Sequence, residues 1–238
     1  MRLDLGYNRF NMLTLQETVN ALNTRYAVKK FDTTRTLSEE QMTLLEETVR
    51  LTPSSFGFEP WKFVFITDPQ VKQKLFEFSP KNPQVIDAPL LIVFCAKDHV
   101  GSQDILDLVE RTSKIRQIEV EKLSGFKKGL RNYIWARNLN AWFLGIPELI
   151  FGTKVFRQWE TKQVYVALGN LLSVCAHHEI DTAPMEGFNQ SAYKIILGDK
   201  IEGYRPVALC AVGYHAADDK FASMAKVRKT QEEVIVKI

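Results

Sequence analysis

Four short segments carry residue types that could hold an anionic ligand, and the most basic of them comes early in the chain. Arg25 and Lys29 stand four residues apart, directly after an amphipathic stretch at 15–22. A guanidinium can bind a phosphate through parallel N–H bonds, and an ammonium can neutralise a second negative group. Taken alone, such a run is more typical of a solvated surface. It predicts an anion site only in combination with other segments.

The other three segments combine turn residues with hydroxyls or with further cations. Residues 53–61, Pro-Ser-Ser-Phe-Gly-Phe-Glu-Pro-Trp, link an expected helix to an expected strand, so their backbone could approach a ligand closely. Residues 183–188, Ala-Pro-Met-Glu-Gly-Phe, are expected to form a loop after a long apolar helix. Lys226 and Arg228 form a second basic pair. Plain connections and solvated charge runs use similar residues, so no single segment is specific.

Several common kinds of site have no signature in this sequence. The two commonest nucleotide fingerprints, G-x-G-x-x-G after a strand and G-x-x-x-x-G-K-[ST], are missing, as is the G-x-S-x-G elbow of many hydrolases. Cys95, Cys175 and Cys210 lie in apolar runs without metal-ligand spacing, so we expect reduced core thiols. The four histidines form no zinc-type cluster either, and no metal site is expected.

Composition and charge narrow the possible partners. The formal net charge of +3 is too small to indicate a nucleic-acid binder. The longest apolar stretches, 88–96 and 164–176, are shorter than the roughly 18 residues that a membrane span needs, and residues 1–14 lack the apolar core of a signal peptide. We therefore expect a cytoplasmic protein that binds neither nucleic acid nor membrane.

Helix and strand patterns alternate along the chain, which indicates a mixed α and β protein. Ser38 to Gln41 is a capping box, and the helix that it opens should end before Pro53. The apolar end at 234–236 is expected to dock as a strand, and 141–152 is either core or a lid. Further helices are expected at 69–78, 104–130 and 156–179, and strands at 61–66, 89–96 and 204–214.

In their order and spacing, the four segments, with a further match at 162–165, resemble the nitroreductase family of FMN-dependent oxidoreductases. The resemblance covers nearly all of residues 15–238. It implies an α+β fold of three α/β/α layers around a central mixed, mostly antiparallel sheet. It also implies a homodimer that exchanges its C-terminal strands, with 1–238 as a single domain and 1–14 as an extension of unknown role.

The resemblance further implies FMN as cofactor and assigns roles to individual residues. Arg25 would grip the flavin phosphate, and Lys29 would reach the pyrimidine edge, where an ammonium stabilises the reduced ring. The Glu186 backbone N–H would point at N5, so no side-chain catalyst is named. The other implied cofactor contacts are Tyr26, Ala27, Pro184, Met185, Gly187, Lys226 and Arg228, with Pro53, Ser54, Ser55 and Gly57 from the other subunit and Gln163 from one of the two chains.

The sequence departs from the family pattern at several of these positions. Ala27 stands where the family often has serine, and Gly57 where asparagine is common, so only backbone contacts are expected there. In Lys81-Asn82-Pro83-Gln84 the usual first residue is asparagine, and close relatives have lysine at the fourth. We therefore expect Lys81 to supply the cation beside Gln84, which leaves the pyrimidine-edge contacts open.

The resemblance also implies the reaction. NADH or NADPH would pass a hydride to flavin N5 and leave, and a nitroaromatic, quinone or similar small-molecule acceptor would then bind, which gives ping-pong kinetics. Tyr133 would lie near the acceptor, although core packing is the more common role for such an aromatic. The same fold could instead reduce a pteridine, an enone or a halogenated aromatic, or act as a flavin-binding redox sensor. A flavin-free domain with solvated cations is the remaining alternative.

Overall fold

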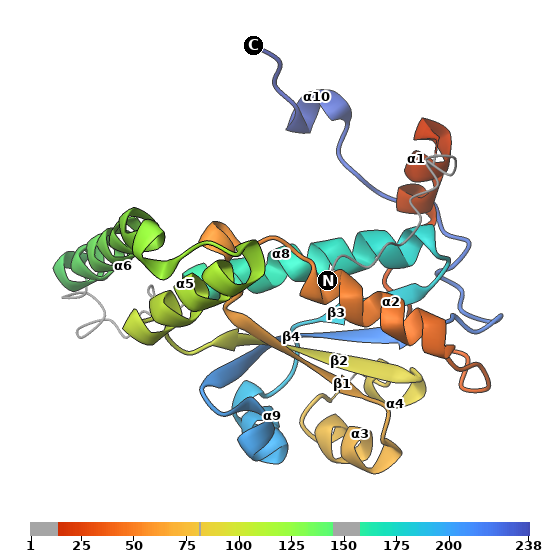
Figure 1. The fold of residues 1–238 in the computed structure, drawn as a ribbon. Helices are drawn as coiled ribbons and strands as arrows, with labels where there is room; N and C mark the ends of the chain where they lie inside the picture. The colour runs from red at the N-terminus through yellow and green to blue at the C-terminus, as the bar shows by residue number, and fades with distance from the viewer. Residues whose placement is uncertain (1–13, 81, 145–157) are drawn as a thin grey trace.

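The computed structural model describes residues 14–80, 82–144 and 158–238, and its centre is an antiparallel sheet (Figure 1). The strands are β1 (Trp61–Ile66), β2 (Leu90–Lys97), β3 (Asp181–Met185) and β4 (Tyr204–Gly213), in the order β1-β2-β4-β3. An isolated parallel bridge joins Ala27 to Thr182. The strands expected at 61–66, 89–96 and 204–214 are confirmed, and β3 was missed.

Strand β2 explains why the sheet is covered on both faces. Its residues from Leu90 to Ala96 are all fully buried, and successive side chains point to opposite faces. Leu90, Ile92, Phe94 and Ala96 pack in one core cluster, whereas Leu91, Val93 and Cys95 pack in another. A strand that is buried on both faces has a continuous run of apolar residues, and the sequence shows such a run at 88–96.

Helices cover both faces of the sheet and complete three layers, as Figure 1 shows. On one face, α2 (Glu39–Arg50) and α8 (Gln158–His177) supply the apolar side chains of the first cluster. On the other face, α3 (Pro69–Phe76), α4 (Gln84–Asp87) and α9 (Gln190–Leu197) supply the second. The expected α+β, three-layer fold is confirmed, with no strand pair among the four named strands being parallel.

Capping side chains determine where several helices begin. The capping box at Ser38 begins α2, and the Asp68 carboxylate accepts from the Gln70 N–H at 2.8 Å to begin α3, which ends at Phe76 rather than Phe78. Thr14 caps α1 (Leu15–Thr24) in the same way. The remaining helical elements are η1 (Ser55–Gly57), α5 (Ser102–Arg116), η2 (Val120–Leu123), α6 (Ser124–Leu144), η4 (Gly198–Ile201) and α10 (Gln231–Val234).

Two expectations about these elements are wrong. The helix expected over 104–130 is broken, because Gln117 adopts a left-handed conformation with φ of 55° that ends α5. The segment 183–188 is not a loop throughout, because residues 183–185 belong to β3. That strand lies at the sheet edge, where proline is tolerated, so Pro184 does not prevent pairing.

The C-terminal segment also differs from expectation within the single chain. Residues 231–234 form the short helix α10, and 235–238 have no assigned strand. In Figure 1 this end projects away from the sheet and helices, and Val234 and Val236 are 61% and 83% exposed. Residues 234–236 thus form no strand on their own chain, and their exchange as a strand in a dimer stays a prediction. The expectations for residues 1–13 and for 145–152 fall outside the described residues.

Other sequence expectations concern single residues. Cys95, Cys175 and Cys210 are free and buried, as expected, and burial raises the pKa of the Cys95 and Cys175 thiols to about 12. In the described part of the chain, no group of three or more His, Cys, Asp or Glu side chains could hold a metal ion. None of the described helices is both long and apolar enough to cross a membrane.

Candidate functional site

A cavity of about 460 Å³ lies between the end of α1, the residues that follow it and the chain after β4. Three of the four predicted segments meet there. Arg25 and Lys29 come from the first, Pro184 from the third, and Lys226 and Arg228 from the fourth. Tyr26 and Ala27 line the cavity as well. None of the described lining residues is an aspartate or glutamate, so four cations share one space without an acidic partner on its wall.

Lys226 is repelled by two other cations at this cavity. The pKa of Lys226 is lowered by burial and by the positive charges of Arg25 and Arg228. The Lys226 ammonium donates to the Leu22 carbonyl oxygen at 2.6 Å and also to that of Arg25. These carbonyls lie at the C-terminal end of α1, where a cation is favourable. Lys226 therefore fixes the end of α1 beside the cavity, and a bound anion would relieve the remaining repulsion.

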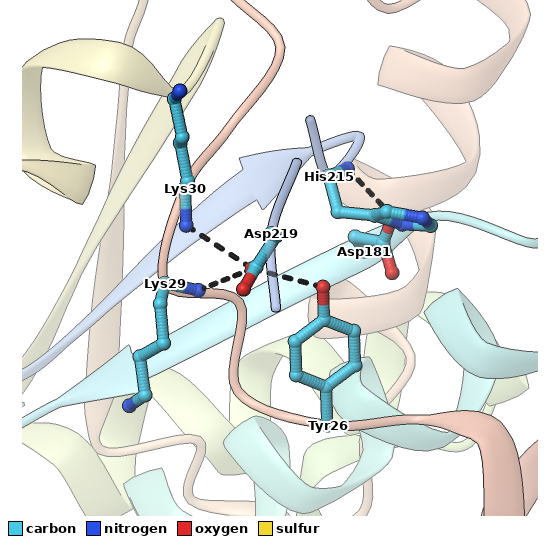
Figure 2. Close-up of polar contacts among 6 residues, drawn as sticks. All are labelled: Tyr26, Lys29, Lys30, Asp181, His215 and Asp219. Atoms are coloured by element: carbon cyan, nitrogen blue, oxygen red, sulfur yellow. Dashed lines mark hydrogen bonds and ion pairs between the residues drawn. The ribbon is translucent and has the colours of Figure 1, made fainter. Parts of the chain in front are cut away.

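Lys29 combines a fixed backbone with a side chain that is directed away from Asp219. Its N–H donates to the Asp219 carboxylate at 2.9 Å, and its side chain extends away from that carboxylate, as Figure 2 shows. Lys29 is also one of the residues that line the cavity. Its ammonium is thus not paired with Asp219.

The end of β3 and the residues that follow it contribute to this cavity and to a second one of about 720 Å³. Pro184 lines the first cavity, Glu186 lines the second, and Met185 packs against the core. The Tyr165 hydroxyl donates to Glu186 Oε1 at 2.6 Å, and burial together with this bond raises the Tyr165 pKa. The Asn82 amide donates to the Gly187 carbonyl at 2.8 Å. These contacts hold the Glu186 side chain and the Gly187 carbonyl directly after β3.

The segment 53–57 lies apart from the cation cavity in the single chain. The Ser55 N–H donates to Gln163 Oε1 at 2.8 Å, and Ser54 Oγ accepts from the Glu59 N–H at 2.8 Å. Phe56 and Gly57 both adopt left-handed conformations, with φ of 58° and 75°. Neither this segment, Pro53 included, nor Gln163 is among the residues that line the cavity. The structure therefore brings Gln163 to the 53–57 segment, and not to the cations.

Gln84 is also absent from the cavity wall. Its side chain is buried, its Nε2 donates to the Val28 carbonyl at 3.3 Å, and its Oε1 has no hydrogen-bond partner among the described residues. A buried acceptor without a partner lowers stability. Gln84 thus lies next to the backbone of the basic segment without reaching the cavity, and Lys81 is outside the described residues.

Known proteins share this chain's sequence pattern and fold. A model of the nitroreductase family matches residues 22–214. The chain belongs to the nitroreductase family. A Staphylococcus haemolyticus protein named as an NAD(P)H nitroreductase is 30% identical over 231 residues, which cover 94% of this chain and 99% of that protein. The family assignment made from the four segments is confirmed.

Solved nitroreductase structures show the same fold at lower identity. A Bacillus subtilis chain described as a nitroreductase superimposes with a TM-score of 0.77 at 18% identity, covering 94% of this chain and all of that one. An Exiguobacterium sibiricum nitroreductase in complex with FMN gives a TM-score of 0.68 at 19% identity, covering 96% and 99%. The chain is thus matched over nearly its full length.

Tyr133, the predicted substrate residue, lies in an aromatic cluster of this nitroreductase. Its ring centroid is 4.6 Å from that of Phe56 and 6.4 Å from that of Trp159. Phe56 is in η1 and is 51% exposed. Tyr133 therefore accompanies the 53–57 segment and is not on the wall of the cation cavity.

Three residues that connect the site were missed in the sequence. Asp219 links the segment at 25–30 to the chain after β4, as Figure 2 shows, Tyr165 binds Glu186, and Asn82 binds Gly187. Tyr165 and Asn82 stand inside stretches that matched the family pattern, which is a signal that could have found them. Asp219 stands beside Asp218 in a polar stretch, and nothing in the sequence separates the buried carboxylate from the exposed one.

Proposed function

We propose that this chain is an FMN-dependent NAD(P)H oxidoreductase whose flavin phosphate is held by Arg25, Lys226 and Arg228. The observation that carries the proposal is the cavity lined by four cations and no carboxylate among its described residues. Guanidinium and ammonium groups are the donors that suit a phosphate, so the donor set fits FMN. When bound, FMN would supply the hydride chemistry between NADH or NADPH and a nitroaromatic, quinone or similar acceptor.

The chain's own residues would orient the ring and favour its reduced, electron-rich form. Lys29 lines the cavity, and its ammonium would lie at the pyrimidine edge, where a fixed positive charge stabilises developing negative charge. Pro184 and Gly187 would lie along the ring, and the Glu186 backbone N–H would be a donor near N5. With no side chain proposed as catalyst, protons would come from solvent.

We further propose that the site is completed by a second copy of the chain. Ser54, Ser55 and Gly57 are separated from the cation cavity in the single chain, so a partner would have to bring them to it. Because the Ser55 N–H is bonded to Gln163, we assign Gln163 to the same chain as this segment. The exposed Val227 and the apolar C-terminal residues 234–236 are consistent with burial in such a dimer.

Purified protein tests the cofactor directly. A yellow protein, or a colourless one that binds added FMN with quenching of flavin fluorescence, supports the proposal. NAD(P)H oxidation should then depend on an acceptor, and a screen of nitroaromatics, quinones, enones and pteridines would identify its class. Parallel double-reciprocal plots would support the ping-pong order, and intersecting plots would contradict it. A colourless protein that does not bind FMN would overturn the proposal.

Mixed dimers test whether the 53–57 segment acts in the partner. One variant carries Arg25→Glu and Lys226→Glu at the cavity, and the other carries Gly57→Val, which strains a left-handed backbone and adds bulk. In a mixed dimer, one site combines the intact cavity with the intact segment only if the segment reaches across. Flavin binding recovered on mixing supports the exchange, whereas no recovery means that both parts act within one chain.

Tyr133 remains a proposed acceptor contact, now with a structural reason. Its ring packs on Phe56 of the segment that we place over the partner's flavin. Tyr133→Ala should change the ratio of kcat/KM between two acceptors and leave FMN affinity nearly unchanged. An unchanged acceptor preference would restrict Tyr133 to core packing.

A further inference from the structure

Asp219 joins two parts of the chain that are far apart in sequence. Its Oδ2 accepts from the N–H of Lys29 at 2.9 Å, from that of Lys30 at 3.2 Å and from the Tyr26 hydroxyl at 2.9 Å, as Figure 2 shows. Its Oδ1 accepts from the Phe221 N–H at 3.0 Å. One carboxylate thus binds the segment that carries Arg25 and Lys29 to the segment that leads to Lys226 and Arg228. We call these four contacts the Asp219 clasp.

The clasp is buried and its carboxylate is ionised at neutral pH. Asp219 is only 6% exposed, and burial by itself would raise its pKa. The backbone N–H groups of Lys29, Phe221 and Lys30 and the Tyr26 hydroxyl outweigh burial, and the pKa lies below its usual value. Hydrogen bonds to a charged acceptor are stronger than those between neutral groups, so the clasp is a firm connection.

The donors of the clasp leave the cavity's positive charge intact. All four are neutral N–H or O–H groups, and no side-chain ammonium or guanidinium is among them. Tyr26, Lys29 and Phe221 line the cavity, whereas Asp219 does not. The carboxylate therefore holds three lining residues in place from outside the cavity and does not pair with the lining cations. A second contact supports the same region, because the His215 N–H donates to Asp181 at 2.8 Å and the His215 ring lies against Tyr26.

The neighbouring residue provides a matched comparison. Asp218 is also acidic, but its side chain is 68% exposed and pairs with the Lys30 ammonium. Exposed pairs of this kind contribute little to stability. Replacing either aspartate by asparagine removes the same charge from the same stretch of chain, but only the Asp219 change disrupts the clasp.

We infer that Asp219 is a positioning residue: by holding 26–30 against 219–221, it sets the spacing of the two cation pairs and so the affinity for the phosphate of the flavin. The inference rests on the proposed FMN site. It implies that the loss of the clasp weakens binding through the phosphate more than binding through the ring. FMN and riboflavin share the ring and differ in the phosphate, so their comparison separates the two contributions.

The test compares FMN and riboflavin binding, by fluorescence quenching, to wild type, Asp219→Asn and Asp218→Asn. Asparagine keeps the size of the side chain but loses the charge and turns an N–H group toward donors. For Asp219→Asn we expect the Kd for FMN to rise about tenfold or more and the Kd for riboflavin to rise much less. For Asp218→Asn, both values should stay close to wild type. Circular dichroism checks that each variant is folded.

Two outcomes would overturn the inference. Equal losses of FMN and riboflavin affinity would mean that Asp219 has a general structural role, and unchanged FMN affinity would mean that the clasp does not matter. If Asp219→Asn does not fold, Tyr26→Phe removes one donor and should weaken FMN binding more than riboflavin binding, by a smaller factor than Asp219→Asn would. Wild-type protein that fails to bind FMN would instead refute the proposed function itself.

Discussion

The centre of the sheet and the cation cavity differ in what brings their residues together. Strands β2 and β4 pair along nearly their whole length, and their apolar side chains fill a core on each face. The cavity is lined by segments near 25, 184 and 226, and Lys226 joins the last of these to the first through the Leu22 and Arg25 carbonyls. This cavity is lined by four cations, and its described lining residues include no carboxylate. The sheet thus needs no ligand to fill its core, whereas the cavity has an excess of positive charge that an anionic ligand would balance.

This difference shows where stability and binding are separable in the molecule. Apolar burial is non-directional, and its loss affects the whole fold. Charges at a cavity wall contribute little to folding and can even oppose it, but they decide which ligand binds. Changes in the sheet should therefore lower the free energy of unfolding, and changes at the cavity should alter the Kd for FMN.

Reversing two cavity charges should have the largest effect. Arg25→Glu with Lys226→Glu would place carboxylates where we propose the phosphate, and the Kd for FMN should rise at least about a hundredfold. Riboflavin, which lacks the phosphate, should lose less. Fluorescence quenching measures both affinities. If the double variant keeps wild-type FMN affinity, the cavity is not the flavin site.

The control for this variant is Lys74→Glu with Lys200→Glu, which makes the same change in net charge. Both lysines are exposed and lie outside the cavity lining. This control should bind FMN nearly as wild type does. A comparable loss in the control would show that overall charge, and not the cavity, governs affinity.

Gly213→Ala should have the next largest effect, this time on stability. A Cβ at Gly213, the last residue of β4, would overlap the Pro89 ring, at 2.8 Å from its Cγ, and would lie 3.2 Å from Phe31. Such overpacking costs about 1–3 kcal/mol of unfolding free energy, measurable by urea denaturation. Gly129→Ala in α6 is the control, since its Cβ would meet no atom within 4 Å and alanine favours helix. A stable Gly213→Ala protein would show that this part of the core adapts.

The same contrast explains how much of the fold was predictable. β2 is apolar at nearly every position, so its sequence alone identified a central strand. The break after α5 depends on Gln117, which adopts a left-handed conformation. A glycine at this position would have indicated that conformation in the sequence, but a glutamine does not. β3 was missed because Pro184 and Gly187 look like turn residues. Pairing with β4, which is a tertiary contact, decides its conformation.

Prediction of the site had a different limit. Arg25, Lys29, Lys226 and Arg228 could be named because their order resembled a family, and the structure brings them to one cavity. Whether Gln163 belongs with the cations or with the 53–57 segment depends on a hydrogen bond to Ser55 that no spacing encodes. Burial separates Asp219 from Asp218, and burial of a polar residue in an irregular segment follows from tertiary packing only.

Acid should weaken the connection behind the cavity before it affects the sheet. The pKa of Asp219 is depressed in the folded protein, so its contribution is fully present above the pKa of the unfolded chain, about 3.9. It is lost as pH falls through the lower, folded pKa. The difference in unfolding free energy between wild type and Asp219→Asn should be about 1–3 kcal/mol near neutrality and shrink below about pH 4. If the unfolding free energies of wild type and Asp219→Asn stay equally far apart down to about pH 3, the Asp219 charge makes no contribution to stability.

Removing the Tyr165 hydroxyl should have the smallest effect and tests the opposite edge of the site. In Tyr165→Phe the ring stays, but Glu186 loses the donor that holds its side chain. A hydrogen bond of this kind contributes about 0.5–1.5 kcal/mol, so FMN affinity should fall by less than about tenfold. If the Glu186 backbone lies near N5, the absorption spectrum or the midpoint potential of the bound flavin should also shift. The control is Tyr204→Phe, because the Tyr204 ring lies in β4 under the Lys62 ammonium. This control should leave the FMN affinity and the flavin spectrum unchanged. An equal shift in the control would mean that Tyr165 has no specific role at the site.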